Sequence, residues 1–158
     1  MAEETWRVVV YRRPGCPDHR GRSAEKDWRA ARLGPLKRIR TGQAYDLTGS
    51  VTAPTARALA GKLLVDAVMQ EAEVRGVGAG GKSARGFCRA VIWPRQGVTD
   101  SVGETVRLGA RDLRLPVPDK VRAGALFDFW GAAPRKVRRF CETHLMNDLV
   151  HRLELEKC

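Results

Sequence analysis

The chain has 158 residues, enough for one ordinary domain or two small ones, and its 43% hydrophobic and 30% charged residues are typical of a globular protein and exclude a disordered one. The net charge of +11 favours a polyanionic partner, an acidic protein surface or an arginine-rich exterior. No apolar run is long enough to span a membrane, and no signal peptide is evident. The four cysteines do not have the spacing of zinc ligands. We therefore expect a cytoplasmic protein.

The first half of the chain alternates between strand-like and helix-like patterns. Residues 6–13 are rich in β-branched and aromatic side chains and precede a Pro-Gly pair, which predicts a strand closed by a turn. Apolar residues at helical spacing predict helices over residues 18–33 and 54–69. Imperfect alternation predicts a long strand over 36–48, with a bulge or bend at a glycine that could split it, and a short strand over 73–77.

The second half repeats this course. Strands are predicted over residues 89–93, 121–130 and 152–156, the last as an edge strand. Val106, Ala110 and Leu113 line a predicted helix, and a second helix is predicted over 137–150.

The two halves also match residue by residue when the chain is displaced by 82 positions without a gap. Both contain Arg-x-Gly-x-x-Asp-x-x-Gly, and the residues that repeat and are expected to shape the fold are Gly15, Asp18, Gly21, Gly42, Asp66, Gly97, Asp100, Gly103, Gly124 and Asp148. We interpret the chain as a tandem duplication, with repeat 1 over residues 5–75, a glycine-rich linker over 76–86 and repeat 2 over 87–158.

The predicted fold class is α+β. Each repeat is expected to be a β-α-β-α-β unit with an antiparallel sheet and its helices on one face. Because units of about 70 residues are marginal on their own core, the two are expected to pack as a pseudo-twofold pair around a shared core.

No set of residues typical of a catalytic site occurs at matching positions in both halves of the chain. His19, His144 and His151 have no histidine at the matching position of the other half. The carboxylates that do repeat, including Asp46 and Asp128, are expected at turns or caps, where a backbone bond explains them. No catalytic, cofactor-binding or metal-binding residue is therefore predicted, and no cofactor is expected.

Two segments match nucleotide-binding or RNA-binding patterns in part. Residues 76–83 satisfy Gly-x-x-x-x-Gly-Lys-Ser, but the segment that follows predicts a strand instead of the helix that a phosphate loop requires. Residues 85–92 approach an RNA-recognition consensus, with Arg89 in place of an aromatic residue that stacks a base.

The order and spacing of the motifs resemble the PurS family, the small subunit of phosphoribosylformylglycinamidine synthase. The likeness rests in repeat 1 on residues 13–21, Leu33-Gly34, Ile39-Arg-Thr-Gly42 and residues 63–68, and in repeat 2 on residues 96–103, 121–124 and 145–150. The chain is similar to a fused PurS pair, like the PurS-like N-terminal domain of the large one-chain synthases.

The resemblance implies a non-catalytic scaffold in purine biosynthesis that bridges a PurL-like synthase and a PurQ-like glutaminase and helps ammonia reach its acceptor. Under this interpretation the chain is a subunit or domain of a glutamine-dependent ligase rather than an enzyme by itself. The alternatives are a basic RNA-binding module of ferredoxin-like type, with nucleic acid the less favoured partner, and a sensor of small molecules or nucleotide phosphates.

Overall fold

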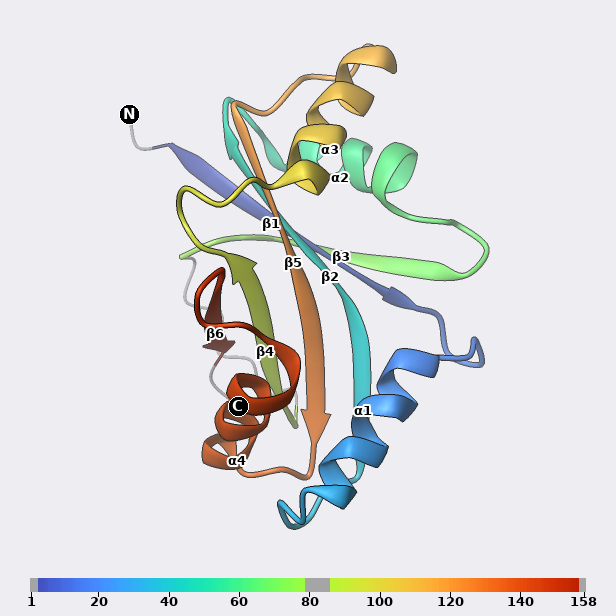
Figure 1. The fold of residues 1–158 in the computed structure, drawn as a ribbon. Helices are drawn as coiled ribbons and strands as arrows, with labels where there is room; N and C mark the ends of the chain where they lie inside the picture. Colours follow the sequence, from blue (N-terminus) through green and yellow to red (C-terminus); the bar gives the residue numbers. More distant parts are fainter. Residues whose placement is uncertain (1–2, 79–85, 157–158) are drawn as a thin grey trace. The chain divides into compact units, whose positions relative to one another are not determined.

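A computed structural model describes residues 3–78 and 86–156 and confirms the α+β class (Figure 1). Six strands and four α-helices follow one another, and the second and fourth helices each continue into a short π-helical turn. The elements are β1 (Glu4–Arg12), α1 (His19–Ala30), β2 (Arg38–Gly49), α2 (Ala53–Leu59) with η1 (Ala60–Leu64), β3 (Gln70–Gly76), β4 (Phe87–Pro94), α3 (Ser101–Asp112), β5 (Lys120–Trp130), α4 (Pro134–Phe140) with η2 (Cys141–Leu145), and β6 (His151–Glu156).

The same order of elements occurs in both repeats, but the displacement between them is not constant. Helix α3 begins 82 residues after α1, whereas α4 and β6 begin 81 residues after α2 and β3. Strand β2 has 12 residues and β5 has 11, so repeat 1 has one additional residue at the end of β2, where Gly49 has a positive φ of 121°. The ungapped alignment was wrong beyond this point, and residues near the end of each repeat pair at a displacement of 81.

All six strands form one antiparallel sheet in the order β3-β1-β2-β5-β4-β6. In each repeat the first strand pairs with the last, in the register Val8 with Val74 and Val91 with Glu154. Strand β6 lies at an edge, and its Leu153 and Leu155 pack against a buried cluster, as their alternation predicted.

The chain forms two compact units, and neither coincides with a repeat. Unit 1 comprises Met1–Cys16, Gln43–Gly80 and Thr99–Gly124, and unit 2 comprises Pro17–Gly42, Gly81–Val98 and Ala125–Cys158. Helix α3 of repeat 2 thus belongs to unit 1, and α1 of repeat 1 belongs to unit 2. Most of the predicted linker, residues 79–85, lies outside the described residues.

The repeated glycines Gly42 and Gly124 mark the places where a strand passes from one unit into the other. Neither glycine interrupts its strand, because β2 is continuous from Arg38 to Gly49 and β5 from Lys120 to Trp130. The prediction that the long strand could be split in two was wrong. Gly42 is instead the last residue of a segment of unit 2, and Gly124 is the last residue of a segment of unit 1.

The core of unit 1 lies between its two helices and one face of its strands. Val8 and Val10 of β1 and Leu47 of β2 point to the same side, because side chains of alternate strand residues share a face. They pack with Leu59 of α2 and with Val106 of α3, which comes from the other repeat.

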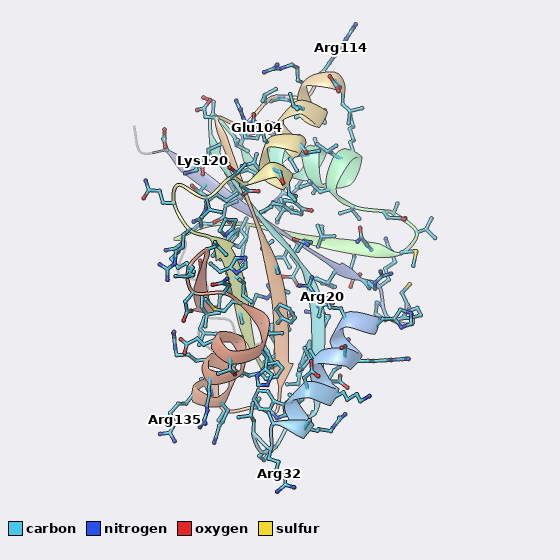
Figure 2. All side chains as sticks on the ribbon, viewed as in Figure 1. Arg20, Arg32, Glu104, Arg114, Lys120 and Arg135 are labelled. Carbon is cyan, nitrogen blue, oxygen red and sulfur yellow. The ribbon has the colours of Figure 1, made fainter. Side chains whose placement is uncertain are left out.

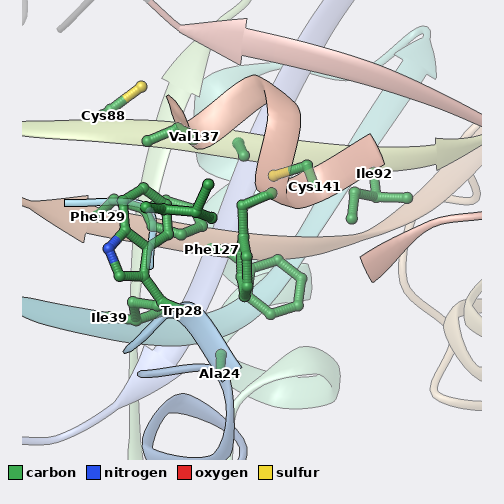
Figure 3. Packing of buried hydrophobic residues seen from close by; sticks show 12 residues of the cluster. Ala24, Trp28, Ile39, Cys88, Ile92, Phe127, Phe129, Val137 and Cys141 are labelled. Carbon is green, nitrogen blue, oxygen red and sulfur yellow. The ribbon is translucent and has the colours of Figure 1, made fainter. Parts of the chain in front are cut away.

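The core of unit 2 is built in the same way but is richer in aromatic side chains (Figure 3). Trp28 of α1 contacts Phe129 of β5 and Phe140 of α4, with ring centroids 5.8 and 5.3 Å apart. Its indole nitrogen donates to the carbonyl of Gly34 at 3.0 Å, so the polar atom of this large buried ring is satisfied. In both units the helices pack on one face of the strands, and both cores contain residues from the two repeats.

The second helix of each repeat ends earlier than predicted. The amide of Val65 donates to the carbonyl of Ala60 and that of Met146 to the carbonyl of Cys141, five residues back in each case. Both residues are extended, with ψ of 128° and 164°, so the helix cannot continue. Apolar periodicity over 54–69 and 137–150 did not reveal this stop because it continues through the turn that follows.

Candidate functional site

The repeated glycine and aspartate motif holds a helix to a strand in each unit. In unit 2 the carboxylate of Asp18 accepts from the amide of Gly21 at 2.8 Å, which confirms the predicted N-cap of α1. The same carboxylate accepts from the amide of Thr41 at 2.8 Å and from its hydroxyl at 2.7 Å. A Cβ at Gly21 would lie 2.7 Å from the carbonyl oxygen of Ile39, so only glycine permits this close approach.

Unit 1 contains the same arrangement, made by repeat 2. Asp100 accepts from the amides of Gly103 and Ala123, each at 2.8 Å. A Cβ at Gly103 would collide with the carbonyl oxygen of Val121. Gly97, like Gly15 in repeat 1, has a positive φ, here 88°, which the turn before the cap requires. The carboxylate of each motif is therefore occupied by structural bonds.

The turn before the last strand shows the change of displacement most clearly. Asp66 accepts from the amide of Val68 at 2.9 Å, and Asn147 accepts from the amide of Leu149 at 3.0 Å. The counterpart of Asp66 is thus Asn147, and the predicted pairing of Asp66 with Asp148 was wrong. The side chain of Asp148 is exposed, and its carbonyl oxygen accepts from Arg95 Nε at 2.6 Å.

Two other repeated carboxylates, Asp46 and Asp128, were expected at turns or caps, and this expectation was wrong. Asp46 lies within β2 and binds two arginines of unit 1. Arg7 donates from Nε to Oδ1 at 2.7 Å and from Nη2 to Oδ2 at 2.9 Å, and Arg122 donates to Oδ2 at 3.0 Å. The side chains of Arg7 and Asp46 are each only 4% exposed, so this is a buried, bidentate ion pair.

Unit 2 repeats the triad around Asp128 of β5. Arg89 donates from Nε to Oδ1 at 2.7 Å, and Arg40 donates from Nη2 to Oδ2 at 2.6 Å. In both triads the inner arginine comes from the same repeat as the carboxylate and the outer arginine from the other. Sequence reasoning missed these sites, although Arg7 and Arg89 also repeat at a displacement of 82 within apolar strands, a pattern that predicts a buried partner.

The histidines and cysteines that the structure describes do not converge on a reactive centre. His151 Nδ1 lies 3.0 Å from the amide of Asn147 in the turn before β6, and His144 stacks on Phe140 with centroids 4.9 Å apart. Burial raises the pKa of the Cys141 thiol to about 12, and the charge of Glu142 adds to this effect, so the reactive thiolate is disfavoured. Within residues 3–78 and 86–156 no group of three or more His, Cys, Asp or Glu could hold a metal ion.

Neither partial nucleotide motif gains support from the structure. Residues 79–85, which include most of the Gly-x-x-x-x-Gly-Lys-Ser match, lie outside the described residues. In the RNA-recognition match, Arg89 is buried against Asp128 in the position where a stacking ring is needed.

The first helix of each repeat, α1 in unit 2 and α3 in unit 1, carries different exposed side chains at equivalent positions. Helix α3 exposes Val102 and Leu108, at 51% and 49%, and its C-cap Leu113, which was predicted to line the helix, is 50% exposed. The counterparts of Val102 and Leu108 on α1 are the exposed cations Arg20 and Lys26. Since exposed aliphatic residues on one helix favour protein contacts, we regard these two surfaces as the candidate functional site.

No helix in the part of the chain that the structure describes is long and apolar enough to cross a membrane. No protein-family model matches the chain, and no curated protein is similar enough in sequence to count as a relative.

Proposed function

We propose that the chain is a non-catalytic scaffold of a phosphoribosylformylglycinamidine synthase complex, acting in the cytoplasm in purine biosynthesis. In this role it holds a PurL-like synthase and a PurQ-like glutaminase together, and these are its partners. The choice of complex rests on the resemblance of both repeats to PurS. The observation that carries the scaffold role is the divergence between α3 and α1, because a bridge between two different proteins needs two different surfaces.

The chemistry of the described residues supports the same role. Asp18, Asp100, Asp46 and Asp128 are committed to helix caps and buried ion pairs. A carboxylate that accepts from a buried guanidinium or from two backbone amides has its oxygen atoms occupied by structural bonds.

Sedimentation velocity with three purified proteins tests this proposal. The chain, a PurL-like subunit and a PurQ-like subunit from the same cell are expected to form a ternary complex that the two subunits do not form without the chain. A variant with Val102→Asp and Leu108→Asp is expected to lose one partner and keep the other, because a charge cannot be buried in an apolar contact. A mixture in which the chain sediments alone contradicts the proposal.

The alternative is a basic RNA-binding module, which the positive charge favours. Binding through phosphate contacts would weaken by orders of magnitude between low and moderate salt. A gel-shift titration with generic RNA and duplex DNA separates the two functions, since a scaffold is expected to bind neither tightly.

A further inference from the structure

The positive charge of the chain belongs almost entirely to one compact unit. Unit 2 contains 18 of the 29 Lys and Arg residues and 8 of the 18 Asp and Glu residues, a formal excess of ten. Unit 1 contains the remaining 11 and 10, an excess of one. In the sequence the arginines look scattered, because each unit is assembled from three separate segments. A partner for the charge should therefore be sought on unit 2.

One end of unit 2 gathers exposed cations. The amide of Lys37 donates to the carbonyl of Trp130 at 2.8 Å, which holds the loop after α1 beside the end of β5. Figure 2 shows Arg32 of that loop and Arg135 of α4 at this end. We call these exposed residues the basic surface: Arg29, Arg32, Lys37, Arg38, Arg135 and Arg138.

A pair of half-buried rings lies beside Arg38, on the face of the strands opposite the core, because the strand neighbours Cys88 and Phe129 are core residues. Phe87 and Trp130 are paired across β4 and β5, with ring centroids 4.6 Å apart. The guanidinium carbons of Arg38 and Arg40 each lie 5.0 Å from the centroid of Trp130. Arg40 donates to Asp128, whereas the side chain of Arg38 is exposed. A guanidinium held over a ring, as that of Arg38 is, loses water from its face and suits bidentate binding of a carboxylate or phosphate.

Unit 1 does not carry this cluster. Thr5 and Thr48 occupy the positions of Phe87 and Trp130, and their hydroxyl oxygens lie 3.0 Å apart. Lys120 takes the place of Arg38. The cluster of two rings and two arginines is thus a feature of unit 2 that the duplicated fold does not require.

We infer that the basic surface, with the Phe87 and Trp130 pair beside its Arg38, is the docking site for an acidic segment of a protein partner. This inference rests on the proposed scaffold function and names the chemistry of one partner. Charge complementarity selects an acidic chain, and the combination of Trp and Arg is typical of the centres of protein interfaces. Nucleic acid is less well suited, because binding of single strands uses rings open to a base, whereas Trp130 packs against Phe87 and two guanidinium groups.

The repeat supplies matched variants for the test. Arg29, Arg32, Arg38 and Arg138 in unit 2 correspond to Arg111, Arg114, Lys120 and Arg57 in unit 1, and all eight are exposed. Changing either set to Gln removes four positive charges from the whole chain. Fluorescence anisotropy then measures the affinity of each full-length variant for labelled poly-L-glutamate and for poly-uridylate RNA at the same ionic strength, with circular dichroism to confirm folding.

We expect the unit 2 variant to lose about tenfold or more in affinity for poly-L-glutamate and the unit 1 variant to change within about twofold. Equal losses in both variants, or no binding of poly-L-glutamate by the unmodified chain, would overturn the inference. Tighter binding of RNA that depends on the unit 2 set would assign the surface to nucleic acid instead. If the unit 2 variant loses poly-L-glutamate while the unmodified chain forms no ternary complex, the surface stands and the proposed function fails.

Discussion

Asp128 is a fully buried carboxylate of unit 2, with a side chain that is 0% exposed. Each unit contains one such triad, made of one aspartate and two arginines. In both triads the outer arginine is more exposed than the inner one. An ion pair of this kind is costly to break because a buried charge loses a partner that compensates for its removal from water. The triads therefore hold strand alignment and do not provide reactive groups.

Removing the carboxylate should be far more harmful than removing an outer arginine. Asp128→Ala removes the buried carboxylate to which Arg89 and Arg40 both donate, and it is expected to lower the free energy of unfolding by about 3 to 5 kcal/mol. Arg122→Gln removes a side chain that is 30% exposed from the other triad and should cost about 1 kcal/mol or less. Urea denaturation of both variants measures the difference, and equal losses would contradict the distinction.

The raised pKa of the Cys141 thiol predicts that the folded chain loses stability in alkaline solution. Its pKa is raised from 9.0 to about 12 by burial, so the folded chain keeps a proton that the unfolded chain releases. This contribution is fully present below pH 9 and is lost as pH rises towards 12. Burial raises the pKa of Tyr45 in the same direction.

Cys141→Ala should therefore flatten the fall in unfolding free energy between pH 9 and pH 11, although it lowers stability at pH 7. Chemical denaturation at several pH values measures both effects. A variant whose pH dependence parallels that of the unmodified chain would show that this thiol does not contribute.

At the scale of elements, the junction between a helix and a strand depends on glycine for a steric reason. A Cβ at Gly21 meets the carbonyl oxygen of Ile39 and the carboxylate of Asp18, whereas a Cβ at Gly61, in the π-helical turn η1, meets nothing within 4 Å. Only the first position lies at a contact between backbones. The conformational freedom of glycine is not needed at Gly61.

Gly21→Ala should destabilise the chain by about 1 to 3 kcal/mol, because the helix must move away from the strand and strain the cap. Gly61→Ala is the control and is expected to be neutral or stabilising by up to about 1 kcal/mol, since alanine is the better helix former. Thermal unfolding measures both. A stable Gly21→Ala variant would contradict the close-approach explanation.

Local patterns in the sequence predicted the strands, the first helix of each repeat and the caps Asp18 and Asp100, because alternation, helical spacing and turn residues act over short distances. They did not predict which helix covers which strands. That arrangement depends on the burial of Val106 against β1 and β2, and of Trp28 against β5, far apart in the chain. The triads were missed for the same reason, since Arg40 and Asp128 are brought together only by the fold.

At the scale of the whole molecule, both cores need side chains from both repeats. Val106, Ala110 and Val121 complete the core of unit 1, and Trp28 and Ile39 complete that of unit 2. A repeat without its companion would expose these apolar faces to water. The duplication is therefore one cooperative structure in its packing, while the pseudo-twofold arrangement of the repeats stays a prediction.

Expressing residues 1–80 and 87–158 separately tests this dependence. Each fragment is expected to lack a cooperative unfolding transition, because the missing helix leaves its core open, and mixing the fragments should restore one. A fragment that unfolds cooperatively by itself would contradict the shared cores.

The most direct test of the scaffold function compares the rates at which the assembled complex uses glutamine and free ammonia as its source of nitrogen. With purified PurL-like and PurQ-like subunits, we predict that adding the chain raises the rate of formylglycinamidine ribonucleotide formation from glutamine and leaves the rate from free ammonia unchanged. A rate from glutamine that is the same with and without the chain would contradict the scaffold function.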